Sequence, residues 1–197
     1  KKQIVPIEMP QRKGPPVTVT DDEEPNRVSL SKLRELKPVF RDNGVLTVGN
    51  SPSCNDGAAA LVVMAEEEAR SLGLTPMARI VGYAGAALAP EWFTLAPIDA
   101  IRLALKKTGL TLADIDLFEI NEAFSAVSLA INRELGLDPK KVNVNGGAVA
   151  LGHPIGATGA RLGTTLLHAM EARRARRGLV SLCIGGGEAL AVIVERP

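Results

Sequence analysis

The sequence predicts a layered α/β fold, and three observations support this prediction. Short apolar runs of strand length alternate with longer helical patterns through the second half of the chain, which is typical of a sheet covered by helices. Glycine and asparagine stand where several of these runs end, as expected for turns and helix ends. The chain has 197 residues, of which 46% are hydrophobic, so it is long enough to bury the core of one or two domains.

The first 50 residues predict an irregular loop region. Each proline fixes its own φ angle and lacks an amide donor, which disfavours regular structure. The prolines of this region are Pro6, Pro10, Pro15, Pro16, Pro25 and Pro38. One short helix is expected over 31–36. After the loop region, the apolar run 58–64 favours a strand, and 66–72 favours a short helix.

A compact α/β unit is expected to follow, beginning with a strand over 79–83 and a helix over 98–107. A second strand is predicted over 117–120. Asn121 comes directly after it and is a candidate N-cap for a helix over 122–135, which ends before a glycine. Capping alone would account for this asparagine, so its position is not by itself a sign of chemistry.

A glycine-rich stretch from Gly146 to Arg161 contains His153, which is followed by Pro154. Glycine allows unusual backbone angles and close approach of another molecule. The proline disfavours a helical conformation for the histidine, so the imidazole is expected on a turn. From Gly156 onward the pattern is helical, and a histidine at the start of a helix can meet a developing negative charge. A glycine-rich loop with a structural histidine is the alternative.

Cys183 lies near the end of a predicted strand over 179–184, and another strand is expected over 189–194. The glycines at 185–187 predict a hairpin or tight connection between them. They do not form a dinucleotide-binding pattern, because they open a strand rather than a helix. The thiol is either inert packing or, where a positive group lowers its pKa, a proton carrier.

Composition and charge exclude several classes of function. The formal net charge of +1 gives no reason to expect nucleic acid as a partner. Two cysteines far apart in sequence do not suggest a disulfide framework, and two histidines without a Cys/His cluster do not suggest a metal site. No apolar run reaches membrane-spanning length and no signal peptide is visible, so we expect a cytoplasmic protein without membrane association.

Three motifs, in this order, resemble the C-terminal half of the thiolase family. Asn121-Glu-Ala-Phe124 is similar to that family's Asn-Glu-Ala-Phe motif, and residues 146–161 are similar to its glycine-rich histidine motif. Cys183-Ile-Gly-Gly-Gly187 is similar to its Cys-x-Gly-Gly-Gly motif. Residues 49–60 resemble the segment that leads from the thiolase loop domain back into the core, so the resemblance covers essentially the whole chain.

The resemblance implies a layered α-β-α-β-α fold made of two similar halves. This chain would then hold the C-terminal half and part of the loop domain. Residues 1–55 are expected to belong to the loop domain, 56–76 to the end of the N-terminal core, and 77–197 to the C-terminal domain.

The resemblance also implies a function: an acyl-CoA C-acyltransferase that catalyses Claisen condensation and its reverse, the thiolysis of 3-ketoacyl-CoA. An enolate must form near neutral pH, which needs a base and an oxyanion hole. By resemblance, Cys183 moves the proton, His153 donates into the oxyanion hole, and Asn121 holds a water in that hole. Gly185 would offer a backbone N–H to the hole of the acyl-enzyme. The residues expected along the pantetheine tunnel are Ala123, Phe124, Ile155, Phe40 and Val48.

The substrates implied are acyl-CoA and CoA, with no separate cofactor. Thiolases carry the acyl group on a nucleophilic cysteine, and the motif for that residue does not occur in this sequence. Cys54 lies in a different context and is expected to be structural packing. We therefore expect an N-terminal thiolase half, in the same or another chain, to complete the site. By resemblance the assembly is a homodimer or homotetramer.

Two alternatives remain at this point. A β-ketoacyl synthase shares the fold, but those enzymes use two histidines with their nucleophile, whereas here Cys183 follows the histidine loop. A non-catalytic acyl-CoA-binding or scaffolding subunit could use a thiolase-like half. The intact set of Asn121, His153 and Cys183 argues against that second alternative, and the missing nucleophile motif argues for it.

Overall fold

A four-stranded mixed sheet forms the centre of the structure, a computed structural model that describes residues 3–197. Its strands are β3 (Arg79–Ala87), β4 (Leu117–Ile120), β5 (Arg177–Cys183) and β6 (Glu188–Glu195). The order across the sheet is β3-β6-β5-β4. β6 runs antiparallel to both of its neighbours, and β4 runs parallel to β5.

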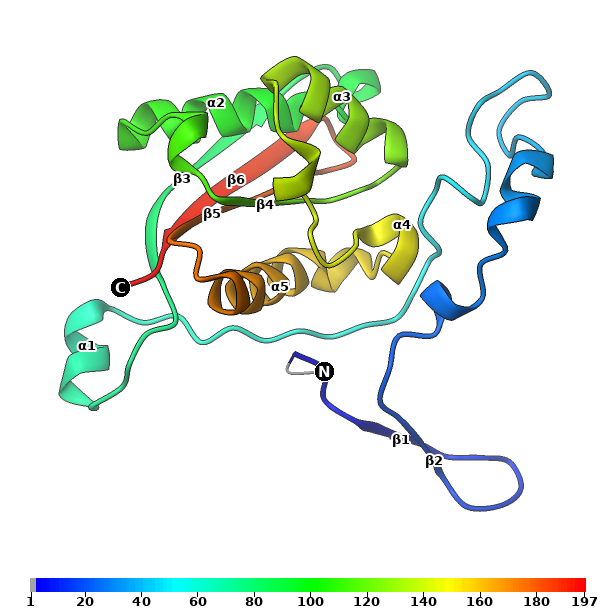
Figure 1. The fold of residues 1–197 in the computed structure, drawn as a ribbon, viewed down its shortest axis with the longest axis horizontal. Helices are drawn as coiled ribbons and strands as arrows, with labels where there is room; N and C mark the ends of the chain where they lie inside the picture. Colours follow the sequence, from blue (N-terminus) through cyan, green and yellow to red (C-terminus); the bar gives the residue numbers. More distant parts are fainter. Residues whose placement is uncertain (1–2) are drawn as a thin grey trace.

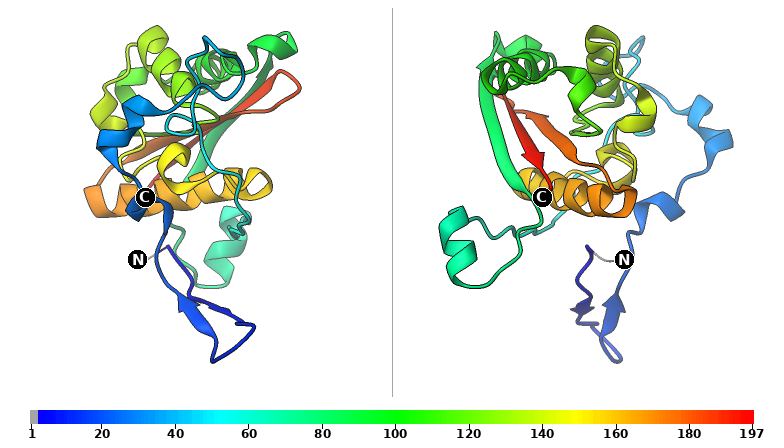
Figure 2. Two further views of the ribbon diagram at one scale, coloured as in Figure 1. Left: turned by 90° about the vertical axis from the view of Figure 1, so that its right-hand side faces the viewer. Right: turned by 60° about the vertical axis from the view of Figure 1, so that its left-hand side comes forward.

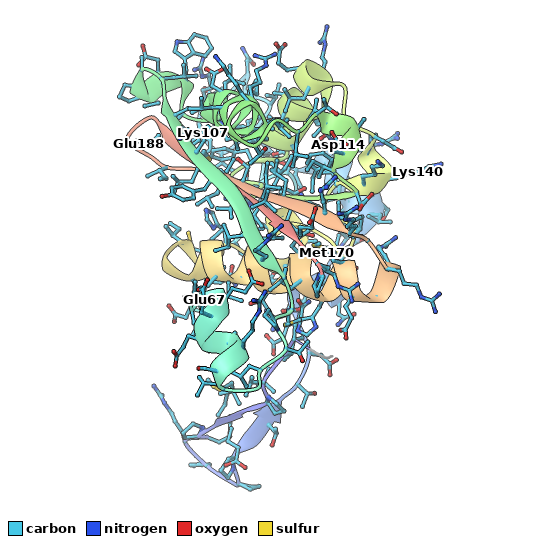
Figure 3. The ribbon with its side chains drawn as sticks, turned by 90° about the vertical axis from the view of Figure 1, so that its left-hand side faces the viewer. Glu67, Lys107, Asp114, Lys140, Met170 and Glu188 are labelled. Carbon is cyan, nitrogen blue, oxygen red and sulfur yellow. The ribbon has the colours of Figure 1, made fainter. Side chains whose placement is uncertain are left out.

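Helices cover both faces of this sheet (Figure 1). α2 (Ala96–Thr108) and α3 (Ser125–Leu135) lie on one face, and α5 (Thr158–Arg173) lies on the other. Figure 3 shows Lys107 on α2 and Met170 on α5 on opposite sides of the strands. The layered α/β fold is therefore confirmed. The described part of the chain forms three layers, α-β-α, of the five that the resemblance implies for a whole thiolase.

Two hydrophobic clusters hold the layers together. The larger one joins the sheet to α2 and α3, and it includes Ile101, Ile115, Ile120, Ile131, Leu179 and Ile193. The smaller one joins the sheet to α5, and it includes Leu117, Leu162, Leu166, Ala169, Met170 and Val180. Because successive residues of a strand face opposite sides, Glu119 of β4 points to the same side as Leu117, toward α5. This carboxyl group is thereby buried beside the second cluster.

The remaining elements project away from these layers (Figure 2). β1 (Ile7–Met9) and β2 (Val17–Val19) form a small antiparallel hairpin in the proline-rich region, where the sequence predicts no strands. Two 3-10 helices follow at Glu24–Asn26 and Leu30–Glu35, the second close to the expected helix at 31–36. α1 (Glu66–Ser71) matches the short helix expected after the loop region.

The strand expected over 58–64 is wrong. The segment is extended, but it has no hydrogen-bonded strand partner among residues 3–197. Leu61 packs against α5, where its Cδ1 would lie 2.9 Å from a Cβ added at Gly163, whereas Val62 is 86% exposed. Apolar composition favours a strand only where a neighbouring strand can accept its hydrogen bonds.

The predicted start of the helix at 122 is also wrong. α3 begins at Ser125, and the preceding Phe124 is extended, with φ −149° and ψ 156°. Asn121 therefore does not cap α3. The other elements of this half differ from the predicted bounds by a few residues at most. A short helix, α4 (Ala148–Leu151), precedes His153, and a single 3-10 turn leads into α5. No helix within residues 3–197 is long and apolar enough to cross a membrane.

Candidate active site

Asn121 and His153 meet at the edge of the sheet where β4 ends. Asn121 is 1% exposed, and its backbone N–H donates to the carbonyl oxygen of Ser181 on β5 at 2.9 Å. This bond fixes the asparagine just beyond the last paired residue of β4. Its side-chain Nδ2 lies 3.3 Å from Nε2 of His153. The structure thus brings together two residues that lie 32 positions apart.

The backbone of His153 is held by the segment that precedes the extended run. His153 N–H points to the carbonyl oxygen of Ser53 at 3.1 Å and to Oδ1 of Asn55 at 3.2 Å. Cys54 and His153 form an isolated parallel β-bridge. Gly152 has φ +98°, and a Cβ there would lie 2.2 Å from Asn55 Oδ1, so only glycine allows this approach.

The ring of His153 is fixed from its other side. Nδ1 lies 2.7 Å from Oγ1 of Thr158, the first residue of α5. Burial lowers the pKa of His153, and the positive charge of Arg161 lowers it further. The imidazole is therefore neutral at neutral pH. Because both ring nitrogens have a polar neighbour, the orientation of the ring is fixed. A fixed orientation is what a group needs if it is to stabilise a charge that develops at one defined place.

Glu122 connects the Asn121 loop to the His153 loop. Its Oε2 accepts the backbone N–H of Val149 in α4 at 3.0 Å. Its Oε1 accepts from Nδ2 of Asn143 at 3.3 Å, and that asparagine also bonds both backbone groups of Ile120. A negative charge near the start of α4 is favourable, since the first amide groups of a helix lack backbone partners.

Cys183 ends β5, two residues beyond Ser181, which pairs with the last residue of β4. It pairs with Ala189 of β6 and is half-buried. Burial raises the pKa of its thiol, an effect that a backbone hydrogen bond partly offsets. At neutral pH, and without a bound ligand, Cys183 is therefore mostly a thiol rather than a thiolate. Gly185 lies in the turn that follows, and a Cβ added there would meet nothing within 4 Å.

The residues expected along the tunnel are only partly brought together. Phe40 and Phe124 meet edge to face, with ring centroids 6.1 Å apart. Both line a pocket of about 520 Å³ whose other lining residues all lie between positions 41 and 46. Val48 and Ile155 do not line this pocket and are 69% and 76% exposed, and Ala123 packs against the larger core cluster.

Sequence reasoning missed the residues that hold these groups in place. Thr158, Asn55 and Glu122 each bond one of the candidate groups or its loop, although each lies in or beside a motif already recognised. The signal was indirect: Gly147 and Gly152 are the positions where a side chain would collide with Glu122 and Asn55. A glycine can therefore indicate that another residue approaches the backbone closely, but the sequence alone does not identify that other residue.

Two titratable side chains near the site, Glu119 and Arg161, have buried polar atoms, and Arg161 is close enough to act on His153. Both carboxylate oxygens of Glu119 and three nitrogens of Arg161 are buried without a hydrogen-bond partner in the described part of the chain. Burial raises the pKa of Glu119 to about 8, against the opposing effect of Arg161 and the reinforcing effect of Glu122. Glu119 is therefore largely protonated at neutral pH. Within residues 3–197, no group of three or more His, Cys, Asp or Glu side chains is placed to hold a metal ion.

Comparison with family models gives two matches. The model of the thiolase C-terminal domain matches residues 74–196, and the model of the thiolase N-terminal domain matches residues 1–67. The chain therefore carries matches to both domain models, and is not limited to the C-terminal one.

Relatives and solved structures agree with these matches. A probable acetyl-CoA acyltransferase of Staphylococcus aureus is 50% identical over 195 residues, which is 98% of this chain and 49% of the relative. An acetyl-CoA acetyltransferase of Pseudomonas aeruginosa is 50% identical over 197 residues, 100% of this chain and 50% of the relative. The crystal structure of the Bacillus anthracis acetyl-CoA acetyltransferase superposes with a TM-score of 0.95 at 48% identity, over 100% of this chain and 50% of that one.

The crystal structure of human mitochondrial 3-ketoacyl-CoA thiolase gives a TM-score of 0.89 at 41% identity, over 98% of this chain and 49% of that one. The chain thus spans about half the length of the curated relatives and solved structures that it matches.

Proposed function

The chain belongs to the thiolase family, and from this we propose that it supplies the oxyanion-binding and proton-transfer groups of an acyl-CoA C-acyltransferase. The reaction is the reversible Claisen condensation of acyl-CoA thioesters, or thiolysis of a 3-ketoacyl-CoA in the other direction. Relatives named acetyl-CoA acyltransferase and acetyl-CoA acetyltransferase support this class of substrate.

The observation that carries the proposal is the contact between Asn121 and His153 beside the end of β5. Asn121 Nδ2 and His153 Nε2 lie 3.3 Å apart, at the edge of the sheet where Cys183 ends its strand. An amide and an imidazole held this way can stabilise a thioester oxygen as it becomes an enolate, with the bound water held by Asn121. Gly185 supplies a backbone N–H in the adjacent turn.

Cys183 is assigned the proton transfer. Enolate formation requires a base close to the α-carbon, and the reverse step requires an acid. A half-buried thiol whose pKa is raised suits the acid form at rest. Its thiolate must then be favoured by groups of the loaded site, since a raised pKa alone disfavours it.

The CoA portion is proposed to run past the paired phenyl rings. Phe40 and Phe124 offer apolar surface to the pantetheine, and Ala123, Ile155 and Val48 would complete the tunnel around them. The exposed faces of Ile155 and Val48 are available for such contact.

The acyl-carrying cysteine is proposed to come from an N-terminal thiolase half, in the same or another chain. The sequence has two cysteines, and neither Cys54 nor Cys183 lies in the nucleophile motif. The active assembly would be a homodimer or homotetramer in the cytoplasm, without nucleic acid. The second candidate function is a non-catalytic acyl-CoA-binding or scaffolding subunit.

The test is Cys183→Ala in the protein that also carries the nucleophilic cysteine, with Cys54→Ala as the matched control. We expect exchange of the α-protons of acetyl-CoA with deuterated water to slow strongly in Cys183→Ala only, while acylation of the other cysteine stays detectable by mass spectrometry. Unchanged exchange in Cys183→Ala would remove its assigned role and favour the non-catalytic subunit.

A further inference from the structure

Thr158 contributes a fully buried hydroxyl next to the ring of His153. Its Oγ1 lies 2.7 Å from His153 Nδ1 and 3.0 Å from the carbonyl oxygen of Pro154. A threonine hydroxyl has one proton, so it can donate to one of these two atoms only. A carbonyl oxygen cannot donate, so the contact with Pro154 is a hydrogen bond only when Thr158 supplies the proton.

The other contact then requires a proton from the histidine. The carbonyl oxygen of Pro154 also accepts the backbone N–H of Ala157 at 2.8 Å, so it does not depend on Thr158 for a partner. If the hydroxyl pointed at Nδ1, however, its fully buried oxygen would face that carbonyl oxygen at 3.0 Å with no proton between them, a repulsive contact. With the proton on Nδ1, both short contacts are hydrogen bonds in one continuous chain from ring to hydroxyl to carbonyl. We propose that Thr158 fixes neutral His153 in the tautomer that carries its proton on Nδ1 and a lone pair on Nε2.

Asn121 agrees with this tautomer but does not decide it. Its Nδ2 amide group can donate into the Nε2 lone pair at 3.3 Å. An amide turned by half a rotation would place Oδ1 there and suit a proton on Nε2, and Oδ1 has no partner of its own within residues 3–197. The contact between Thr158 and Pro154 is unaffected by that choice, so it is what selects between the two tautomers.

The consequence concerns what His153 offers to a ligand, and it rests on the proposed function. The neutral ring presents an acceptor at Nε2. It donates a hydrogen bond from Nε2 to a thioester oxygen only after Nε2 has bound a proton, while Nδ1–H continues to donate to Thr158. Burial and Arg161, the charged group that acts on the ring, lower the pKa of His153, so the neutral form is the resting one. Thr158 is thus a positioning residue that acts through His153.

Nitrogen NMR of the polypeptide of residues 1–197 tests the tautomer directly. The chain has two histidines, so the variant His168→Gln assigns the signals of His153. Two-bond proton–nitrogen correlations at neutral pH should show Nδ1 protonated and Nε2 unprotonated in the unmodified chain. Thr158→Val keeps the shape of the side chain but removes the hydroxyl, and it should shift the proton to Nε2. Thr158→Ser keeps the hydroxyl and should retain the original pattern.

Two results would overturn the proposal: Nε2 protonated in the unmodified neutral chain, or no change of tautomer in Thr158→Val. The measurement needs no turnover, so it stands apart from the proposed reaction. In the active enzyme, Thr158→Val should lower kcat on the order of tenfold with KM nearly unchanged, and Thr158→Ser should restore it. The two proposals can fail separately. If NMR shows the stated tautomer but variants of His153 and Thr158 leave turnover unaltered, the proposed function is wrong, whereas the tautomer assignment stands.

Discussion

At the scale of single residues, His153 carries the sharpest prediction. A hydrogen bond to a developing oxyanion is stronger in the transition state than in the ground state, so its loss lowers kcat more than it raises KM. We expect His153→Ala in the active enzyme to lose on the order of 100- to 1,000-fold in kcat. Steady-state kinetics and thermal unfolding on the same sample measure this. A folded variant with near-normal kcat would leave His153 as a structural loop residue.

Glu119 gives a prediction for stability. Its pKa is about 8 in the folded chain, against 4.5 as the ordinary value, so between these pH values the folded state binds more protons than the unfolded state. The stabilisation from this group is fully present below about pH 4.5 and is lost as the pH rises toward 8. Its contribution falls by up to about 1.4 kcal/mol per pH unit in that window.

The variant Glu119→Gln, which cannot ionise, isolates this effect. Urea unfolding from pH 5 to 8 should show a steeper loss of stability with rising pH in the unmodified chain than in the variant. Parallel curves for the two proteins would mean that Glu119 is ionised in the folded state, paired with Arg161.

Sequence patterns marked Asn121, His153 and Cys183 as candidate site residues because each stands at a recognisable break between elements. The same patterns did not predict how the residues are held. Asn121 was expected to cap a helix, a role that depends on local sequence, whereas its side chain faces His153 through a tertiary contact. Asn55 was missed for the same reason, because its bond to His153 spans 98 positions and local preference describes only neighbours in sequence. Thr158 lies five residues after His153, but its contact with the ring depends on the turn between them, which the sequence pattern did not define.

At the scale of elements, the hydrogen bond between Glu122 and α4 is the contact that a single substitution should break most easily. A Cβ at Gly147 would lie 2.2 Å from Glu122 Oε2, so the carboxylate would have to leave Val149 N–H. We expect Gly147→Ala to destabilise the chain by about 1–3 kcal/mol and to lower kcat in the active enzyme by moving the loop before His153.

Gly159→Ala is the matched control for this change. Gly159 lies within α5, and a Cβ there meets nothing within 4 Å. Alanine is preferred over glycine inside a helix by about 0.5–1 kcal/mol, so this variant should unfold at a slightly higher temperature. Equal effects of the two substitutions on thermal unfolding would show that the contact of Gly147 with Glu122 is unimportant.

Elements with strong periodicity were predicted well, and those that depend on a partner were not. α2, α5 and the β5–β6 hairpin carry their own pattern, and their core faces match the two clusters. The run 58–64 has strand-like composition but no adjacent strand in the described chain, and β1 and β2 pair despite the prolines around them. Pairing is a property of two segments, so one segment does not determine it.

At the scale of the whole molecule, the sequence context of the two cysteines determines whether we expect thiolase activity from these residues alone. We predict that the polypeptide of residues 1–197 alone shows no thiolysis of acetoacetyl-CoA, because neither cysteine occupies the nucleophile motif. A CoA-dependent turnover assay measures this, and a polypeptide with the nucleophilic cysteine should supply activity when added. Robust turnover by residues 1–197 alone that is abolished by Cys54→Ala would assign Cys54 the nucleophilic role instead.

The hydrogen bond between Asn55 and His153 joins residues 98 positions apart, and this has a kinetic consequence. The site forms only after a long loop has closed, an event that comes late compared with pairing of β5 and β6. The single N–H of His153 is shared between Ser53 and Asn55, so this contact contributes on the order of 1 kcal/mol, well below the 5–15 kcal/mol typical of global unfolding. A free energy of this size implies that the segment at 53–55 is detached in roughly a tenth of the molecules while the sheet stays folded. Each such opening releases the backbone of His153, so the site can be lost and regained many times within the lifetime of one folded chain.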